Sequence, residues 1–163
     1  MDENYTFSFL CTGNSCRSII AESILNKNGK GKFRAFSAGS KPLGYINPMT
    51  IKLLESKGHN ISKLSSKNWD QFCSMPSMDF IITVCDNAAG EVCPIWPGRP
   101  INAHWGLTDP AYVDGDEDIQ YQAFLDTYTT LEKRINKLIN ALSVNVNGKV
   151  TRENLQNALS SVC

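Results

Sequence analysis

Hydrophobic and polar positions along the chain predict strands that alternate with helices. Short runs that are apolar, or that alternate between apolar and polar residues, predict strands at residues 5–10, 33–38, 79–84 and 101–105. Apolar residues at helical spacing predict helices that begin at Arg17, at Pro48 and after Gly115. The run at 79–84 is nearly all apolar, which is typical of a strand buried on both faces of a parallel sheet. This order of elements predicts an α/β fold, with helices flanking a four-stranded parallel sheet in a single doubly wound domain.

The composition of the chain limits its location and its partners. Its 163 residues are 42% hydrophobic, enough for one core, which we place in residues 1–143 with a helical extension at 144–163 docked on it. The formal net charge is zero, so we expect neither nucleic acid nor a membrane surface as a partner. No apolar run is long enough to span a bilayer, and the first residues are acidic rather than signal-like. We therefore expect a cytoplasmic protein whose six cysteines serve chemistry rather than structural bridges.

The stretch Cys11-Thr-Gly-Asn-Ser-Cys-Arg-Ser18 joins the first predicted strand to the first predicted helix. Glycine and asparagine permit a tight loop, and backbone N–H groups at a helix N-terminus favour anions. We therefore predict that an oxyanion binds to Thr12, Gly13, Asn14, Ser15, Cys16 and Arg17. Cys11 is the predicted nucleophile, because the N–H donors, the helix dipole and Arg17 favour its thiolate. Arg17 offers a planar fork for two oxygens, and Ser18 is predicted to donate to the cysteine sulfur.

A second pair of cysteines follows the third predicted strand. Cys85 and Cys93 bracket a small, polar segment at the carboxyl edge of the sheet, where α/β proteins bind ligands and where Cys11 also leaves its strand. This placement lets Cys85 attack an adduct on Cys11, after which Cys93 takes over the disulfide. An ordinary buried cysteine is the alternative interpretation for each thiol. A zinc site of Cys85, Cys93 and His104 is another, although its spacing offers no obvious fourth ligand.

These motifs resemble the low-molecular-weight tyrosine phosphatase family, and within it the arsenate reductases. The resemblance rests on the loop after Cys11, on Ser37-Ala38-Gly39, on the segment from Cys85 to Cys93, and on Asp109-Pro110. It covers roughly residues 5–140. It implies the strand order 2-1-3-4, and it implies that Asp109 overhangs the anion loop and acts as the general acid.

The resemblance also implies how the anion loop is supported. In the family, the positions of Asn14, Glu22 and Ser37 brace this loop. Some arsenate reductases hold a potassium ion behind the loop with an aspartate near the position that Lys67 occupies here. We therefore expect the ammonium of Lys67 to take the place of that cation, and we expect no bound metal or cofactor.

Other residues receive structural interpretations. His59 lies in a helix-ending loop and is predicted to be a solvated capping residue. His104 stands at a strand end and is predicted to be a hydrogen-bonded structural residue rather than a general base. Trp69 is predicted to enter the core from a short helical turn, and Tyr112 to line the mouth of the site. No chemistry is assigned to Cys73.

The resulting hypothesis is an arsenate reductase. Cys11 attacks bound arsenate with help from Arg17 and Asp109, and a disulfide then passes through Cys85 and Cys93. An external thiol restores the enzyme, either thioredoxin or glutathione with glutaredoxin. The first alternative is a tyrosine or small-molecule phosphatase that uses the same nucleophile without redox cysteines. The second is a non-catalytic sensor of oxyanions or arsenic.

Overall fold

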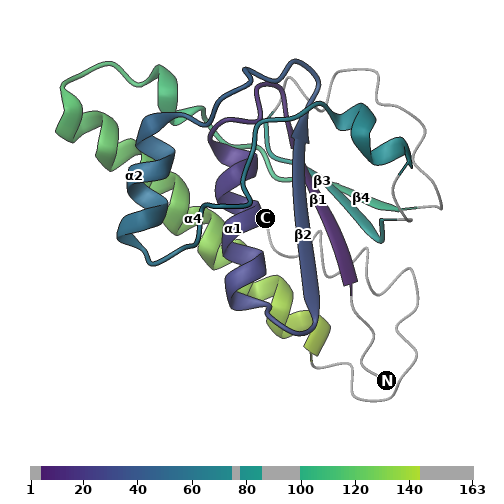
Figure 1. The fold of residues 1–163 in the computed structure, drawn as a ribbon. Coiled ribbons are helices and arrows are strands. Elements are labelled where there is room, and N and C mark those ends of the chain that lie inside the picture. The colour runs from purple at the N-terminus through teal and green to yellow at the C-terminus, as the bar shows by residue number, and fades with distance from the viewer. Residues whose placement is uncertain (1–4, 75–77, 86–99, 144–163) are drawn as a thin grey trace.

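The computed structural model describes residues 5–74, 78–85 and 100–143. Its centre is a four-stranded sheet, made of β1 (Tyr5–Cys11), β2 (Phe33–Gly39), β3 (Phe80–Thr83) and β4 (Ile101–His104). The strands are parallel and lie in the order β2-β1-β3-β4, so β1 is an inner strand with a neighbour on each side (Figure 1). The order and the direction of the strands confirm the fold predicted from the sequence. All four strands therefore end at one edge of the sheet.

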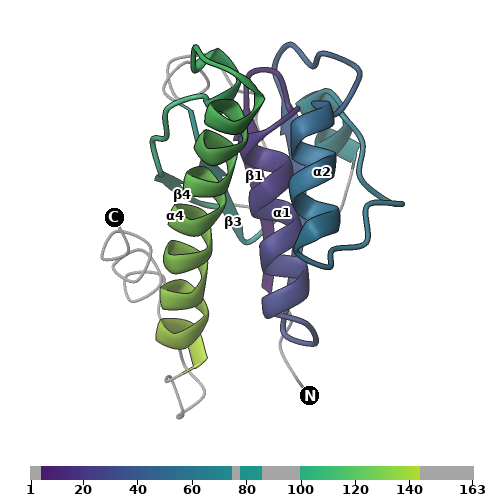
Figure 2. The same ribbon diagram turned by 90° about the vertical axis from the view of Figure 1, so that its left-hand side faces the viewer.

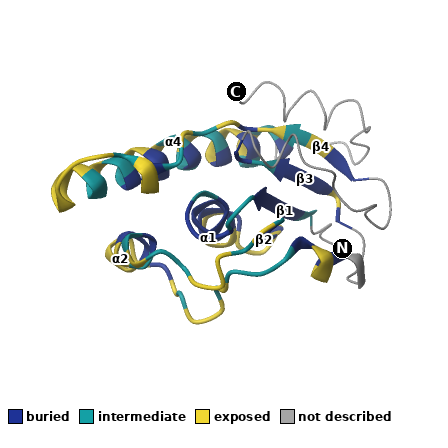
Figure 3. Ribbon diagram, turned by 90° about the horizontal axis from the view of Figure 1, so that it is seen from above, coloured by how far each residue is buried: buried dark blue, intermediate teal, exposed yellow. Residues whose placement is uncertain are grey.

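Helices cover one face of this sheet (Figures 2 and 3). In the described part of the chain they are α1 (Arg17–Asn28), α2 (Pro48–Ser56) and α4 (Glu117–Ser143). Residues 18–25 of α1 are all buried, because this helix lies between α2 and α4 and against the strands (Figure 2). The start of α2 follows from its sequence, since the Asn47 side chain accepts from the Met49 N–H and Pro48 occupies the first turn.

Aromatic and aliphatic residues fill both faces of the sheet. On the helical face Phe7 and Phe80 stack with ring centroids 4.3 Å apart, within a buried cluster that continues into the three helices. On the other face Leu10 packs with Trp69, which the short 3₁₀ helix η1 (Trp69–Ser74) carries into the core. Trp69 is 6% exposed, as predicted from its position in a short helical turn.

His59 differs from its prediction. It was expected to be solvated, but it is buried, and its Nε2 lies 2.8 Å from the hydroxyl of Tyr128 on α4. The backbone does cap the end of α2, because the His59 N–H donates to the Leu54 carbonyl. Gly58 turns the chain there with φ of +79°, and the ring enters the space beneath α4. Burial lowers the pKa of His59, since the charged imidazolium is penalised away from water.

Two further predictions concern the C-terminal extension and membrane-spanning segments. The extension at 144–163 lies outside the described residues, so its docking stays a prediction. None of the helices in the described part is long and apolar enough to cross a membrane.

A candidate oxyanion site at the carboxyl edge of the sheet

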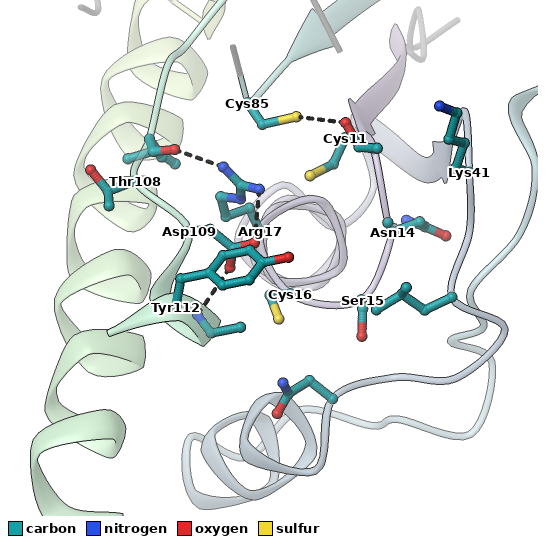
Figure 4. Close-up of a pocket in the computed structure, with 16 residues that line it drawn as sticks. Cys11, Asn14, Ser15, Cys16, Arg17, Lys41, Cys85, Thr108, Asp109 and Tyr112 are labelled. Carbon is teal, nitrogen blue, oxygen red and sulfur yellow. Dashed lines mark hydrogen bonds and ion pairs between the residues drawn. The ribbon is translucent and has the colours of Figure 1, made fainter. Parts of the chain in front are cut away.

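The anion loop leaves β1 at Cys11 and enters α1 at Arg17, and it forms the floor of a pocket of about 630 Å³ (Figure 4). Each residue predicted to bind an oxyanion lines this pocket: Thr12, Gly13, Asn14, Ser15, Cys16 and Arg17. Cys11, Cys85 and Asp109 line it as well, so side chains from three distant parts of the chain meet there. Cys93 lies outside the described residues.

A segment between β2 and α2 holds the carbonyl groups of this loop away from the pocket. The backbone N–H groups of Lys41, Leu43 and Asn47 donate to the carbonyls of residues 12, 13 and 15 at 3.0 to 3.2 Å. Carbonyl oxygens that are occupied on the outer side leave the loop N–H groups for an anion on the inner side. This segment was not predicted to belong to the site, because no local sequence pattern indicates that two loops so far apart in the chain will pair.

Gly39 allows the end of β2 to lie close to the backbone of the anion loop. A Cβ at this position would collide with the carbonyl oxygen of Thr12 and would lie 2.9 Å from that of Cys11. The small residues after β2 were predicted to allow this approach. A larger residue at position 39 would force the two backbones apart.

Asn14 organises the loop from behind. Its backbone has a φ of +47°, in the left-handed region that asparagine tolerates better than most residues. Its side chain donates to the hydroxyls of Ser18 and Ser37 at 2.8 and 3.0 Å, and accepts from the Lys67 N–H at 2.9 Å. These bonds tie the loop to α1, to β2 and to the segment before η1. The Ser18 hydroxyl thus accepts from Asn14 and keeps its own hydrogen for another acceptor.

Glu22 and Lys67 lie behind the same network. Glu22 is 6% exposed, and burial raises the pKa of its carboxyl to about 7, although Lys67 and Ser37 oppose the shift. Burial likewise lowers the pKa of Lys67, while the nearby Glu22 raises it. The Lys67 ammonium donates to the Ser65 carbonyl at 2.7 Å. Lys67 and Glu22 therefore favour each other's charged form, and the placement of this ammonium in the position of a cation stays a prediction.

Arg17 and Asp109 lie next to each other in the lining of the pocket (Figure 4). Arg17 Nη2 lies 3.2 Å from Asp109 Oδ2, and Nη1 donates to the Leu107 carbonyl at 2.8 Å. The other carboxylate oxygen of Asp109 accepts from the Ala111 N–H, which caps the short helix η2 (Pro110–Tyr112). Arg17 Nε is buried and has no hydrogen-bond partner among the described residues.

Two thiols lie at the centre of the site. Cys11 and Cys85 are both buried and both line the pocket, and Cys85 acts on the pKa of Cys11. The Cys85 thiol also lies 3.6 Å from the Thr12 hydroxyl (Figure 4). This pair brings the predicted nucleophile and the predicted second thiol together from positions 74 residues apart (85 − 11).

The pKa of Cys11 does not follow the sequence-based prediction. Arg17 and the Thr12 N–H lower it, as expected, but the hydrogen bond with Cys85 and burial raise it by more. The net direction is upward, opposite to the prediction from the loop alone. Neighbouring thiols titrate as a pair, because a negative charge on one disfavours ionisation of the other. Cys85 thus opposes formation of the Cys11 thiolate, whereas Arg17 favours it.

Cys16 and Tyr112 complete the pocket. Cys16 is buried at the start of α1, and burial raises the pKa of its thiol to about 11, so it is a protonated member of the loop. Tyr112 lines the mouth with 84% of its surface exposed, in the position predicted for it.

His104 is held by Thr83, whose Oγ1 lies 2.7 Å from the ring Nδ1. Its hydrogen bond agrees with the structural interpretation.

Comparisons with known proteins agree with this geometry. The family described as low molecular weight phosphotyrosine protein phosphatase matches residues 6–148. An arsenate reductase of Halalkalibacterium halodurans is 36% identical over 127 residues, which make up 78% of this chain and 89% of that protein. Among solved structures, an arsenate reductase in the phosphate binding state gives a TM-score of 0.69 at 26% identity, over 83% of this chain and 97% of that chain.

A thioredoxin-dependent arsenate reductase of Corynebacterium glutamicum gives a TM-score of 0.63 at 26% identity. The similarity covers 87% of this chain but 63% of that longer chain. The region that the family model matches, residues 6–148, includes the anion loop, the sheet apart from Tyr5, and the three helices that cover it. The chain therefore belongs to the low molecular weight phosphotyrosine protein phosphatase family.

Proposed function

We propose that this protein is a thiol-dependent arsenate reductase in which Cys11 is the nucleophile and Cys85 the second thiol. The observation that carries the proposal is the buried pair of thiols, Cys11 and Cys85, in one oxyanion pocket. Transfer of a phosphoryl group needs one nucleophilic thiol, whereas reduction of As(V) needs two electrons, which two thiols supply. The relatives named arsenate reductase, at 36% identity and similar length, support the same activity.

The first step forms a bond between sulfur and arsenic. Loop N–H groups and the Arg17 guanidinium hold arsenate, and the Cys11 thiolate attacks the arsenic atom. One As–O bond breaks, and its oxygen leaves as water after taking a proton from Asp109. The Arg17 guanidinium, 3.2 Å from Asp109, keeps the acid over the pocket. Arsenic is still As(V) in the resulting Cys11 adduct.

The second step transfers the electrons. The Cys85 thiolate attacks the Cys11 sulfur, the S–As bond breaks, and its electron pair stays on arsenic. Arsenic is reduced to As(III) and leaves as arsenous acid after protonation, while Cys11 and Cys85 are oxidised to a disulfide. The placement of the two thiols suits this order, because Cys85 lines the same pocket in which the adduct on Cys11 forms.

A third thiol and an external reductant complete the cycle in this proposal. Cys93 attacks Cys85, which frees Cys11 and leaves a disulfide between Cys85 and Cys93 for the external reductant. The reductant is a small thiol protein such as thioredoxin, or glutathione with glutaredoxin. The thioredoxin-dependent relative from Corynebacterium glutamicum favours the first of these.

A phosphatase activity of the same pocket is the second candidate. It is favoured by the family to which the chain belongs and by Tyr112, an exposed aromatic ring at the pocket mouth where the ring of an aryl phosphate would lie. In that reaction Cys11 attacks phosphorus, Asp109 protonates the leaving alcohol, and Cys85 takes no part.

Arsenate-dependent NADPH consumption tests the proposal. Two coupled assays are needed, one with thioredoxin and its reductase, the other with glutathione, glutaredoxin and glutathione reductase. We expect turnover in at least one assay, its loss in Cys85→Ser, and its retention in the matched control Cys73→Ser. Absence of turnover in both assays, together with aryl phosphate hydrolysis that survives in Cys85→Ser, would establish the phosphatase instead.

A further inference from the structure

The pocket has a net positive charge that does not come from its arginine. Among the described residues that line it, the charged side chains are Arg17, Asp109 and Lys41. Arg17 and Asp109 form an ion pair at 3.2 Å, so their charges balance. Lys41 forms no ion pair or side-chain hydrogen bond with any described residue. Its ammonium is therefore the one charge of this lining that no described residue compensates.

Lys41 is fixed to the anion loop by its backbone rather than by its side chain. Its N–H donates to the Thr12 carbonyl at 3.0 Å, and Leu43, two residues further, donates in the same way to Gly13. Its side chain is exposed at the rim, on the opposite side of the pocket from Asp109 and Tyr112 (Figure 4). The two cations thus flank the loop from two sides, Arg17 from within and Lys41 from the solvent.

Lys41 and Arg17 differ in which groups of the pocket their charges act on. The pKa of the Cys11 thiol is shifted by burial, by Cys85, by Arg17 and by the Thr12 N–H, and Lys41 is not among these groups. A solvent-exposed ammonium acts mainly on other charges near it, through a field that salt screens. Lys41 is therefore placed to act on a charged ligand from the rim of the pocket, whereas Arg17 also acts on the nucleophile.

We propose that Lys41 selects for the doubly charged oxyanion and against the uncharged product. This inference rests on the proposed arsenate reduction. Arsenate carries negative charge at neutral pH, whereas arsenous acid is neutral, so an uncompensated cation holds the substrate and not the product. Phosphate has the charge and the shape of arsenate, so Lys41 strengthens its competitive binding equally.

Direct binding is the first test, because it does not depend on turnover. In a Cys11→Ser background, calorimetric titration with inorganic phosphate and with arsenate measures the two dissociation constants. We expect Lys41→Met to raise both by about tenfold at low salt, which corresponds to about 1.4 kcal/mol. Lys41→Arg should restore binding, and the difference should shrink at high ionic strength. Lys30→Met removes an exposed lysine outside the pocket and is the matched control for net charge.

Steady-state kinetics of the reactive enzyme is the second test. We expect Lys41→Met to raise the KM for arsenate and the inhibition constant of phosphate by the same factor, with kcat and inhibition by arsenite unchanged. The proposal is overturned if Lys41→Met leaves phosphate binding unchanged, if kcat falls instead, or if Lys30→Met has the same effect. Absence of turnover in the parent enzyme would refute arsenate reduction alone, since the binding test would still decide the role of Lys41.

Discussion

Removal of the Asn14 side chain tests whether the bracing network holds the anion loop. Asn14 is fully buried and makes three side-chain hydrogen bonds, two as donor to Ser18 and Ser37 and one as acceptor from the Lys67 N–H. In Asn14→Ala, the Lys67 N–H loses its acceptor, at a cost of about 1 to 3 kcal/mol. The two serine hydroxyls can rotate toward other acceptors, so we assign about 0.5 kcal/mol to each lost bond.

The backbone of Asn14 contributes a separate amount. Its φ of +47° costs alanine about 1 kcal/mol, but costs glycine almost nothing. We therefore expect Asn14→Ala to lower the free energy of unfolding by about 4 kcal/mol, taking the middle of the range for the unsatisfied N–H. Asn14→Gly lacks the same hydrogen bonds but pays almost no backbone cost. Its loss of unfolding free energy therefore measures the hydrogen-bond network alone, about 3 kcal/mol.

Urea denaturation at neutral pH measures both variants, and phosphate titration reports on the loop itself. We expect both variants to fold and both to bind phosphate more weakly than the parent protein. A loss of less than about 1 kcal/mol in Asn14→Ala, with phosphate binding unchanged, would refute the reasoning, because the loop would then keep its shape without the network.

Other predictions concern titration and packing near the site. Glu22 has a folded pKa of about 7 against 4.5 when unfolded, so the native state binds the extra proton and the free energy of unfolding should fall as pH rises from 4.5 to 7; Glu22→Gln should flatten this slope in urea titrations at several pH values. The pKa of His59 is lowered from 6.5, so its contribution to stability should be present above pH 6.5 and decline as the pH falls below it; an NMR titration that gave a raised imidazole pKa would contradict its burial. Gly39→Ala should cost about 1 to 3 kcal/mol and weaken phosphate binding, as measured by thermal unfolding and calorimetry, because the new methyl group meets the loop carbonyls; an unchanged melting temperature would exclude the collision.

Much of the fold followed from short-range patterns. The alternation of strands and helices, the buried character of β3 and the helix start at Pro48 depend on periodicity and on single residue types, which act within a few positions. The anion loop is of the same kind, since its glycine, its asparagine and the helix that follows are contiguous. A motif that folds on itself can be identified before any distant contact is known.

The prediction for His59 was wrong because burial is a property of the whole molecule. Its position in a helix-ending loop indicated a cap, and the backbone does form one. The ring, however, meets Tyr128, which lies 69 residues away. No local pattern places α4 over that loop, so periodicity could not distinguish a solvated ring from a buried one.

The chemistry of the site also depends partly on local sequence and partly on the tertiary structure. The sequence by itself determined which side chains are able to act, because a thiol, a guanidinium and a carboxyl keep their intrinsic chemistry in any fold. Only the tertiary structure decided that Arg17 is balanced by Asp109, that Lys41 is left uncompensated, and that Cys11 shares its environment with Cys85. The physical reason is that charge balance, desolvation and thiol coupling depend on distances of a few ångströms between residues far apart in the chain, which are fixed only when the strands align.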